Sequence, residues 1–470
     1  MSRQPLKPSA RWALTGLCLA TLMPSLDTSI ANAGLPTLAV AFDASFQQVQ
    51  WIVLAYLLAV TTLIVSAGRL GDLFGRRRLL LIGIGVFSAA SLACALASAW
   101  WWLIAARAVQ GLGAAILLAL TLALVNAAVP KERAGSAMGL LGTMSAIGTS
   151  LGPSLGGLLI AHVGWPWMFL LNLPLGVLNG WLVHRYLPRD EVARKPQRFD
   201  LCGTGVLALT LAAYALAMTR NSEALLSGGL LLLSVVGSGL FIVVEKRVGA
   251  PLLQLSLLRD VQLSSRLAMT LLVATVMMTT LVVGPFYLSR GLSLDSAALG
   301  LALSLGPSLA ALGGVPAGRL VDRFGARRML RGALIAMLGG CSLLALLPMR
   351  LGLPGYLLPM ALLTLGYALF QAANNSAVMA TAEANQRGVV AALLGLARNL
   401  GLISGAAAMG ALFAAASADP TQASPGAIAG AVHLTFALAT GLLLLALSLA
   451  SVATRVRAGA REPGKTVRSR

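Results

Sequence analysis

The sequence predicts an all-α integral membrane protein with fourteen transmembrane helices, and three observations support that class. The chain has 470 residues, of which 58% are hydrophobic and only 11% charged, whereas soluble domains carry about 25% charged residues. Apolar runs of about 20 residues, the length that spans a bilayer, recur along the chain. The net charge of +20 comes from short basic clusters between these runs, which fits membrane topology and argues against a nucleic-acid partner.

The spans follow one another from the N-terminus with short loops between them. They are expected at 12–33, 48–67, 79–98, 103–126, 136–160, 166–187, 201–219, 225–244, 267–288, 296–316, 330–349, 354–377, 388–415 and 431–454. The first run resembles a signal peptide, but it is too long, contains Asp27 and shows no clear cleavage site, so we interpret it as a span. The four cysteines lie inside apolar runs without metal-ligand spacing, so neither a metal site nor a disulfide is expected.

The positions of Lys and Arg support this map. With both termini in the cytoplasm, only Arg220, Arg290 and Arg350 fall in outside loops, and all other basic residues outside the spans lie inside. This asymmetry is the positive-inside rule, and a map that lacked one span would destroy it. Six tryptophans then gather at the outer interface, as in an aromatic belt: Trp51, Trp100, Trp101, Trp102, Trp165 and Trp167.

Two segments of the chain recur in the same order, which indicates an internal duplication. GRLGDLFGRRR at 68–78 returns as GRLVDRFGARR at 318–328, and the glycines at 142, 148, 152 and 157 return at 395, 401, 405 and 410. We therefore predict an N-terminal six-helix half (1–190), an inserted two-helix segment (191–250) and a C-terminal six-helix half with a basic tail (251–470). Parallel halves with a substrate path between them are a transporter architecture.

The fifth span contains an unusual number of glycines and one proline. Gly139, Gly142, Gly148, Gly152, Pro153, Gly156 and Gly157 fall within 19 residues, although glycine costs about 1 kcal/mol and proline about 3 kcal/mol in a helix interior. Either the stretch is a packing face, or it is a moving part of a transporter. Its glycines return in the second half but Pro153 does not, because Ala406 stands at that position.

The repeated loops carry an acidic residue among glycines and arginines. Asp72 is expected to accept hydrogen bonds from helix N-terminal amides or from Arg76 to Arg78, and Asp322 from the corresponding groups. We interpret both loops as latches on the cytoplasmic side rather than as ordinary basic loops. Their residues are Gly68, Asp72, Gly75, Arg76 and Arg77, and Gly318, Asp322, Gly325, Arg327 and Arg328.

These motifs resemble a known family. GRLGDLFGRRR is similar to the cytoplasmic loop signature of the major facilitator superfamily, and 139–157 is similar to the fifth-helix motif of its drug:proton antiporters. LDTSIANAGLP at 26–36 resembles the first-helix signature of the fourteen-helix EmrB/QacA-type subfamily. The resemblance implies a major facilitator fold, alternating access, and export of drugs driven by the proton gradient across the cytoplasmic (inner) membrane.

Three charged residues lie within predicted spans and away from their cytoplasmic ends, where a charge costs roughly 2.5–3.5 kcal/mol and marks a functional hypothesis. Asp27 and Arg107 lie at matching depths, about 6–9 Å from the outer ends of the first and fourth spans. They are therefore expected to pair if those spans adjoin. Asp27 is the candidate proton carrier with Arg107 as its partner, and a static buried pair is the alternative.

Other polar residues are candidates for lining the substrate cavity. Arg398 is expected either to contact an anionic or carbonyl group of the substrate or to tether helices through backbone carbonyls. The complete predicted cavity set is Asp27, Gln110, Asn374, Asn375, Arg398 and Asn399.

The function that this combination predicts is proton-driven multidrug efflux of lipophilic or cationic toxic compounds. The alternative is a dedicated exporter of an endogenous metabolite or a self-made antibiotic. An enzyme is disfavoured, because no catalytic triad, metal cluster or nucleotide-binding loop is visible. No cofactor is expected beyond the proton gradient. The expected partners are small-molecule substrates, protons and lipid, and a periplasmic adaptor is left open.

Overall fold

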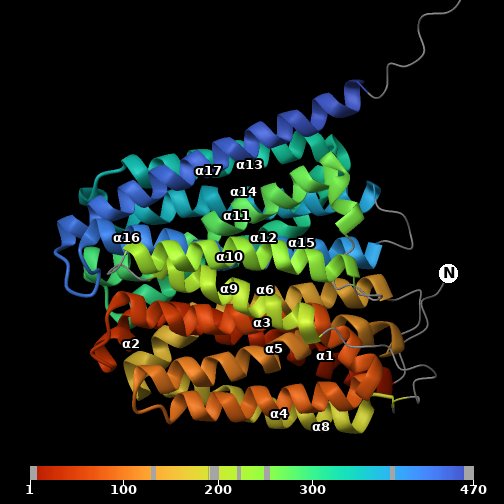
Figure 1. Ribbon diagram of the computed structural model, residues 1–470. Coiled ribbons are helices and arrows are strands. Elements are labelled where there is room, and N and C mark those ends of the chain that lie inside the picture. Colours follow the sequence, from red (N-terminus) through yellow and green to blue (C-terminus); the bar gives the residue numbers. More distant parts are fainter. Residues whose placement is uncertain are drawn as a thin grey trace, which may run out of the picture.

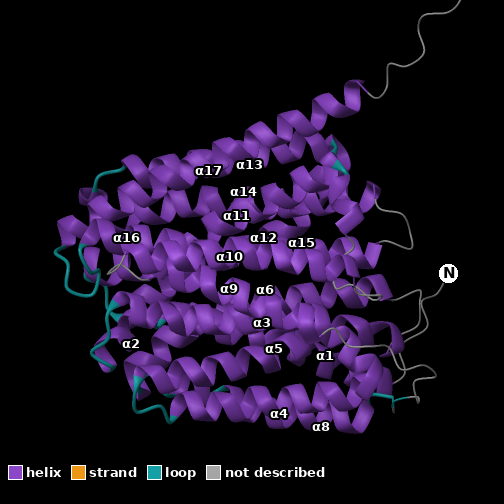
Figure 2. Ribbon diagram, viewed as in Figure 1, coloured by secondary structure: helices purple, strands orange, loops and turns teal. Residues whose placement is uncertain are grey.

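The computed structural model describes residues 8–128, 134–188, 190, 201–219, 224–247, 255–381 and 387–459. Over these residues all regular elements are helices, and the long ones run side by side along one direction in a single bundle (Figures 1 and 2). The prediction of an all-α protein is therefore confirmed.

The helices follow the predicted order. The first half contains α1 (Pro8–Ala33), α2 (Leu35–Ala41), α3 (Phe46–Phe74), α4 (Arg76–Ala95), α5 (Trp100–Ala128), α6 (Ala134–Val163), α7 (Trp167–Leu170) and α8 (Asn172–Tyr186). The insertion contains α9 (Leu201–Thr219) and α10 (Ala224–Arg247). The second half contains η2 (Leu255–Arg259), α11 (Val261–Phe286), η3 (Tyr287–Gly291), α12 (Ser296–Phe324), α13 (Ala326–Leu346), η4 (Met349–Leu351), α14 (Gly352–Thr381), α15 (Arg387–Ser404), η5 (Gly405–Met409), α16 (Gly410–Ser417) and α17 (Pro425–Gly459).

Each of the fourteen predicted spans has a helical counterpart. Within the described residues, thirteen helices are long and apolar enough to cross a membrane. The remaining span, predicted at 166–187, is formed by the short α7 and α8, which meet at Leu171. The thirteenth span is continuous through α15, η5 and α16, and η5 is a π-helical turn that starts at Gly405. It lies where the first half has Gly152 and Pro153, although α6 continues there as an α-helix.

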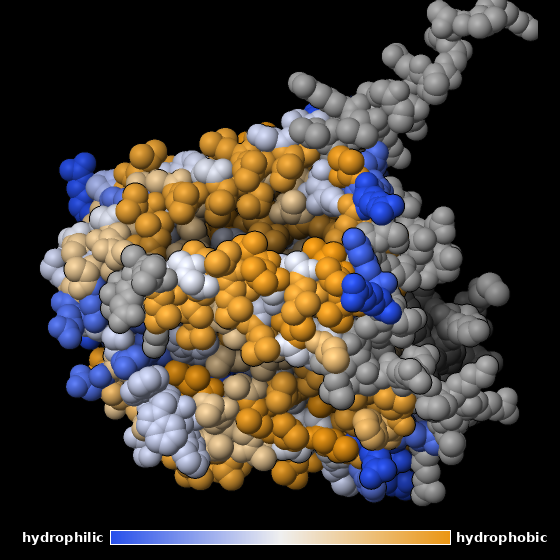
Figure 3. Space-filling model, in the orientation of Figure 1, coloured by the Kyte–Doolittle hydropathy of each residue, from blue (hydrophilic) through white to orange (hydrophobic). Residues whose placement is uncertain are grey.

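The surface has the distribution of side chains that a membrane protein needs. In Figure 3 apolar residues cover the middle of the visible face, and hydrophilic residues lie towards the two ends of the bundle. On α10, Leu232 and Val235 are 64% and 70% exposed. Such a wide apolar surface would be unfavourable in water but is suited to the hydrocarbon core of a bilayer.

The two halves repeat the same helix packing. In the first half α1 packs against α6 and α8, α3 against α5, and α4 against α5. In the second half α11 packs against α15 and α17, α12 against α14, and α13 against α14. The duplicated motifs in the sequence therefore lie at equivalent places in two similar bundles.

The repeated glycines allow close helix contacts of two kinds. Gly148 lies against the α1 backbone at Leu22, and its equivalent Gly401 lies against the α11 backbone at Leu271. A Cβ atom at either position would overlap a backbone oxygen, so a larger residue would push the helices apart. These two glycines hold helices together within a half.

The last glycine of each series contacts the opposite half. Gly157 on α6 lies against Gly300 and the carbonyl of Ser296 on α12, and Gly410 on α16 lies against the side chain of Gln50 on α3. The glycine-rich stretch is thus a packing face within one half and a contact surface between the halves.

The two halves are closed against each other at the end of the bundle that holds α2 and α16 (Figure 1). Gln50 Nε2 donates to the carbonyl of Ala406 in the π-helical turn. The Phe46 ring packs edge-on against Phe286 at 4.9 Å and Phe413 at 5.6 Å between ring centroids. Hydrogen bonding, aromatic packing and the glycine contacts together seal this end.

At the opposite end the same helices have free space around them. A Cβ atom built on Gly142 of α6, Gly314 of α12 or Gly395 of α15 would have no atom within 4 Å. These positions belong to helices that are in contact with the other half at the α2/α16 end. The described residues therefore form a structure that is sealed at the α2/α16 end and has open space beside these three glycines towards the other end.

The inserted helix α9 lies across the seam between the halves. It bonds to α3 through Ser66 and Thr204, whose oxygens are 3.0 Å apart, and through Trp51 Nε1, which donates to Thr219 at 3.0 Å. Its Tyr214 hydroxyl donates to Ser404 of α15 at 3.2 Å. Of the inserted pair, α9 therefore covers one seam between the halves.

The contact between α3 and α9 can be tested by a disulfide. In a Cys202→Ser background, which removes the exposed native thiol, Ser66→Cys with Thr204→Cys should form a disulfide on oxidation in membranes. The hydroxyls are close enough to bring the Cβ atoms near the spacing of about 3.5–4.5 Å that a disulfide needs. Cleavage of an engineered protease site between the two positions, followed by electrophoresis, measures the link. The control pair, Ser66→Cys with Leu232→Cys, should stay unlinked, and equal linking of both pairs would contradict the placement of α9.

Candidate functional site

The carboxylate of Asp27 on α1 lies at the centre of a buried polar cluster. Its Oδ2 accepts a hydrogen bond from Arg107 Nη1 on α5 and forms an ion pair with that guanidinium. Its Oδ1 accepts from Gln110 Nε2 at 2.8 Å and from Asn172 Nδ2 at 2.7 Å. The pairing expected from the matching depths of Asp27 and Arg107 is therefore present.

Arg107 is held from several sides. Its Nη1 also donates to Gln110 Oε1 at 2.6 Å, and its Nε donates to the carbonyl of Ile52 at 3.3 Å. The guanidinium carbon lies 4.3 Å from the centre of the Tyr56 ring, a cation–π arrangement. Arg107 thus connects α5 to both α1 and α3.

Ser91 on α4 and Asn172 at the start of α8 complete the cluster. Ser91 Oγ accepts from Gln110 Nε2 at 2.7 Å and from Asn172 Nδ2 at 3.3 Å, and donates to the carbonyl of Phe87 at 2.8 Å. Asp27, Ser91, Arg107, Gln110 and Asn172, which we call the Asp27 cluster, therefore join four helices of the first half.

The Asp27 cluster is closed to its surroundings. Asp27 and Arg107 are each only 1% exposed, and Ser91, Gln110 and Asn172 are also buried. Burying two charges is costly, and their attraction compensates only when the remaining hydrogen-bonding groups are satisfied. Here both carboxylate oxygens have donors, so the pair is electrically neutral and well bonded. A substrate cannot touch Asp27 in this conformation.

Sequence reasoning missed Ser91, Asn172 and Tyr56. Asn172 is a polar residue within an apolar stretch, which was the one available signal. Ser91 and Tyr56 are common residue types in membrane helices, so only the packing of α3 and α4 against α5 identifies them.

The predicted cavity residues of the second half lie in different settings. Asn374 is buried and donates through Nδ2 to Thr270 Oγ1 on α11 at 2.9 Å. Asn399 is buried, whereas Asn375 and Arg398 are exposed. Asp27 and Gln110 are closed inside the first half. The structure therefore does not bring the six residues into one surface, and their contact with substrate stays a prediction.

A second buried acid was not expected. The eighth span was predicted to end at residue 244, but α10 continues to Arg247 and includes Glu245, which is 3% exposed. Asp27 is therefore not the only buried carboxyl group in the helices. Glu245 lies in the last turn of α10, far along the helix from its middle.

The predicted latch loops form tight turns, and an acid outside the motif bonds to the first of them. Gly75 and Gly325 join consecutive helices with φ of 91° and 83°, a conformation that favours glycine. The amides of Arg77 and Arg78 at the start of α4 donate at 2.8 and 3.0 Å to the carboxylate of Asp190. Asp190 is therefore the acid that caps this helix.

Two further expectations about these motifs have different outcomes. The side chain of Asp72, like the surroundings of Gly139, lies outside the described residues. Asp322 is exposed, and the described residues show no hydrogen bond between it and Arg323, Arg327 or Arg328. The role of the second loop as a latch stays a prediction.

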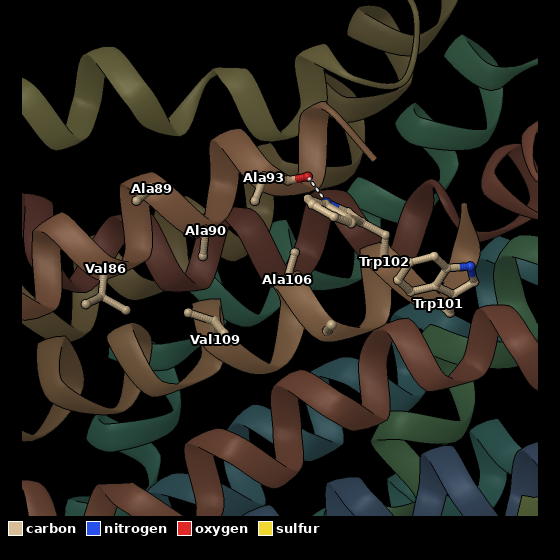
Figure 4. A pocket seen from close by; sticks show the side chains of 9 residues that line it. Val86, Ala89, Ala90, Ala93, Trp101, Trp102, Ala106 and Val109 are labelled. Carbon is tan, nitrogen blue, oxygen red and sulfur yellow. Dashed lines mark hydrogen bonds between the residues drawn. The ribbon is translucent and has the colours of Figure 1, made fainter. Parts of the chain in front are cut away.

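Two cavities lie away from the Asp27 cluster. A groove of about 550 Å³ between α4 and α5 is shown in Figure 4. Trp102 Nε1 there donates to the carbonyl of Ala93 at 3.0 Å. The groove is lined by Val86, Ala89, Ala90, Ala93, Trp101, Trp102, Ala105, Ala106 and Val109. A polar cavity of about 520 Å³ at the α2/α16 end includes Asp43, Arg290 and Asp419 from both halves. The groove offers only apolar surface for binding.

Comparison with known proteins gives a consistent family match. The model of the Major Facilitator Superfamily matches residues 17–406 and, in an overlapping second match, residues 266–469. The chain is 30% identical over 400 residues to the riboflavin transporter RibZ of Clostridioides difficile, covering 85% of this chain and 87% of RibZ. It is 32% identical over 415 residues to the multidrug resistance protein Stp of Mycobacterium tuberculosis, covering 85% of this chain and 75% of Stp.

Similarity to solved structures concerns the fold. A bacterial homologue of the human lysosomal transporter Spinster, solved in an inward-facing and unoccupied conformation, superimposes with a TM-score of 0.67 at 14% identity. The match covers 98% of this chain and 100% of that structure. The arrangement of helices is therefore shared with a transporter.

The ion pair predicts an unusual pattern of stability. Arg107→Gln should destabilise the protein by about 3–5 kcal/mol, because it leaves the buried Asp27 charge without its partner. Asp27→Asn combined with Arg107→Gln removes both charges and should be less destabilising than Arg107→Gln alone. Thermal unfolding in detergent, followed by size-exclusion chromatography, compares the variants. A double variant that is as unstable as the sum of the two single variants would contradict a coupled pair.

Proposed function

Because the chain belongs to the major facilitator superfamily, and is therefore a multi-pass membrane transporter rather than an enzyme, we propose that it exports drug-like compounds by exchange for protons. The single observation that carries the proposal is the Asp27 cluster, in which the charge of a buried carboxylate is balanced by one arginine. The similarity of the chain to the multidrug resistance protein Stp supports a substrate range of lipophilic toxic compounds. The proton gradient is the energy source, and no cofactor is required.

Protonation of Asp27 is the proposed coupling step. A proton on the carboxyl group removes the charge that Arg107 is paired with, and an unpaired buried guanidinium is unfavourable. The four helices that the cluster joins would then repack, so that binding and release of the proton bias the arrangement of the first half. A buried acid within a span is a common element of proton relays.

Alternating access supplies the transport path. If the termini lie in the cytoplasm, as we propose, the sealed α2/α16 end faces outside, and the end with open space beside α6, α12 and α15 faces the cytoplasm. The molecule would then be ready to accept substrate from inside the cell. Exchange requires the seal formed by Gln50, Phe46 and Gly157 to open while the opposite end closes, where the glycine-arginine loops would engage. We propose the cytoplasmic (inner) membrane as the location, without a required adaptor protein.

One observation favours a second candidate function. The riboflavin transporter RibZ is 30% identical to this chain over most of both lengths. A dedicated exporter of a metabolite therefore remains a specific alternative to a drug exporter of broad range. The two differ in breadth of substrate, which transport assays measure directly.

Replacement of Asp27 tests proton coupling. In everted membrane vesicles with an acidic interior, the native protein should accumulate substrate, and Asp27→Asn should reduce gradient-driven accumulation to the level of empty vesicles. A panel of antibiotics, dyes and riboflavin distinguishes broad from narrow specificity. The measurement is substrate content per amount of inserted protein.

Two controls make that result interpretable. Asp260→Asn makes the same chemical change at an exposed N-cap residue and should leave transport unchanged. Asp27→Asn with Arg107→Gln restores neutrality, so that loss of transport in this variant is not due to an unpaired buried charge. Uphill, gradient-dependent accumulation by Asp27→Asn would refute Asp27 as the proton carrier.

Replacement of Pro153 tests the glycine-rich stretch. The carbonyl of Pro153 lies against Gly300 on α12, at the seam between the halves, so Pro153→Ala should alter how tightly the seam closes. We expect an increased proton leak in vesicles without substrate, together with reduced coupled export. Fluorescent pH measurement in reconstituted vesicles follows the leak. If leak and export both equal those of the native protein, the stretch acts in packing alone.

A further inference from the structure

Arg398 lies in the middle of α15 and is the one exposed member of the three charged residues that were predicted within spans. Its chain neighbours Ala397 and Asn399 are buried. Ala391, seven residues earlier and thus on the same helix face, is exposed as well. The space beside the intervening Gly395 is empty to 4 Å. This side of α15 is therefore open rather than packed.

The neighbours of α15 show where this open side points. Gly401 and Gly405 pack against α11, and Ser404 bonds to Tyr214 of α9, which covers the seam on another side. Ala406 bonds to Gln50 of the opposite half. Ala406 lies eight residues from Arg398, about 12 Å along the helix and about 80° around it.

Arg398 therefore occupies the sector between the helix contacts to α11 and to α3. The insertion α9 lies on a different side, about 120° around the helix at Ser404. The open side of α15 thus faces the space between the two halves, about 12 Å from the seal, and not the lipid beyond α9. The pseudo-symmetric residue Ser145 lies on the equivalent helix α6 and bonds to Ser25 of α1 at 2.8 Å.

The charge of that space differs from what the sequence implied. The sequence placed one acid, Asp27, among the predicted cavity residues. In the structure Asp27 is neutralised by Arg107 and closed off. Among the described residues, Arg398 has no hydrogen bond or ion pair, so the expected alternative of a tether to backbone carbonyls is not observed. Of the charged residues in the predicted cavity set, Arg398 is therefore the one that a substrate can reach, and its charge is positive.

We propose that Arg398 binds an anionic oxygen group of the substrate, so that the transported compounds are amphiphiles with a carboxylate or a comparable group, not lipophilic cations. A guanidinium offers paired donors that match a carboxylate, and an unpaired cation in a partly desolvated space repels another cation. The inference rests on the proposed export function but specifies its substrate class. It explains why one arginine stands within the second half's glycine-rich helix.

Two dyes with a shared xanthene framework provide the probe: fluorescein, which is anionic, and rhodamine 123, which is cationic. Dye content of everted vesicles with an acidic interior is measured after lysis at one fixed pH. The native protein should accumulate fluorescein in preference to rhodamine 123. Arg398→Gln should raise the KM for fluorescein by about 10- to 100-fold, the size of a charge-assisted hydrogen bond, without weakening transport of rhodamine 123.

Two variants control for charge and for general damage. Arg398→Lys keeps the charge but loses the paired donors, so its KM for fluorescein should lie between those of the native protein and Arg398→Gln. Arg350→Gln removes an exposed arginine from η4 at the α2/α16 end and should leave both dyes unaffected. Size-exclusion profiles in detergent confirm that each variant is folded.

Binding without a gradient separates this inference from the proposed function. Fluorescence anisotropy with protein in nanodiscs measures the affinity for each dye directly. If fluorescein binds through Arg398 but is not accumulated, proton-driven export fails and the site stands. The proposed substrate class is wrong if the native protein prefers rhodamine 123, if it binds neither dye, or if its affinity for fluorescein equals that of Arg398→Gln. Gradient-driven uptake of rhodamine 123 would still support export.

Discussion

The ion pair of Asp27 and Arg107 is the interaction on which the first half depends. Two opposite charges are buried among α1, α3, α4, α5 and α8, and they are tolerated because each has its partner and further hydrogen bonds. Such a pair is strongly destabilised when one member loses its charge. A proton can remove the charge of Asp27, so the same constraint that stabilises this conformation gives a proton the means to change it.

Close packing decides how that change can reach the second half. Within each half, Gly148 and Gly401 fix one helix against its neighbour, whereas Gly157 and Gly410 contact the opposite half. The helices that carry the packing contacts also carry the seal, so a repacking of the first half alters the seam directly. The π-helical turn at Gly405 offers the Ala406 carbonyl to Gln50, and α9 bonds to both halves across one seam.

The distribution of charge between the halves gives them separate tasks. In the first half, the charged pair within the spans lies in a closed, neutral cluster, whereas Arg398, within a span of the second half, is exposed and in our proposal faces the space between them. Proton binding and substrate binding would then occur at different places, linked only through the shape of the seam. In that arrangement the identity of the substrate depends on the second half, which is consistent with relatives that are named for different cargoes.

The sequence by itself determined the membrane class, the order of the helices, the duplication and the pairing of Asp27 with Arg107. Those features follow from hydrophobic length, charge asymmetry and helix rise, which are local properties of the chain. Only the tertiary structure added Ser91, Tyr56 and Asn172 to the cluster, brought Asp190 to the start of α4, and separated the exposed Arg398 from the closed Asp27. Each of these depends on which helix faces which, and neighbouring helices, not the residue type, decide whether a polar side chain is buried, bonded or free to meet a substrate.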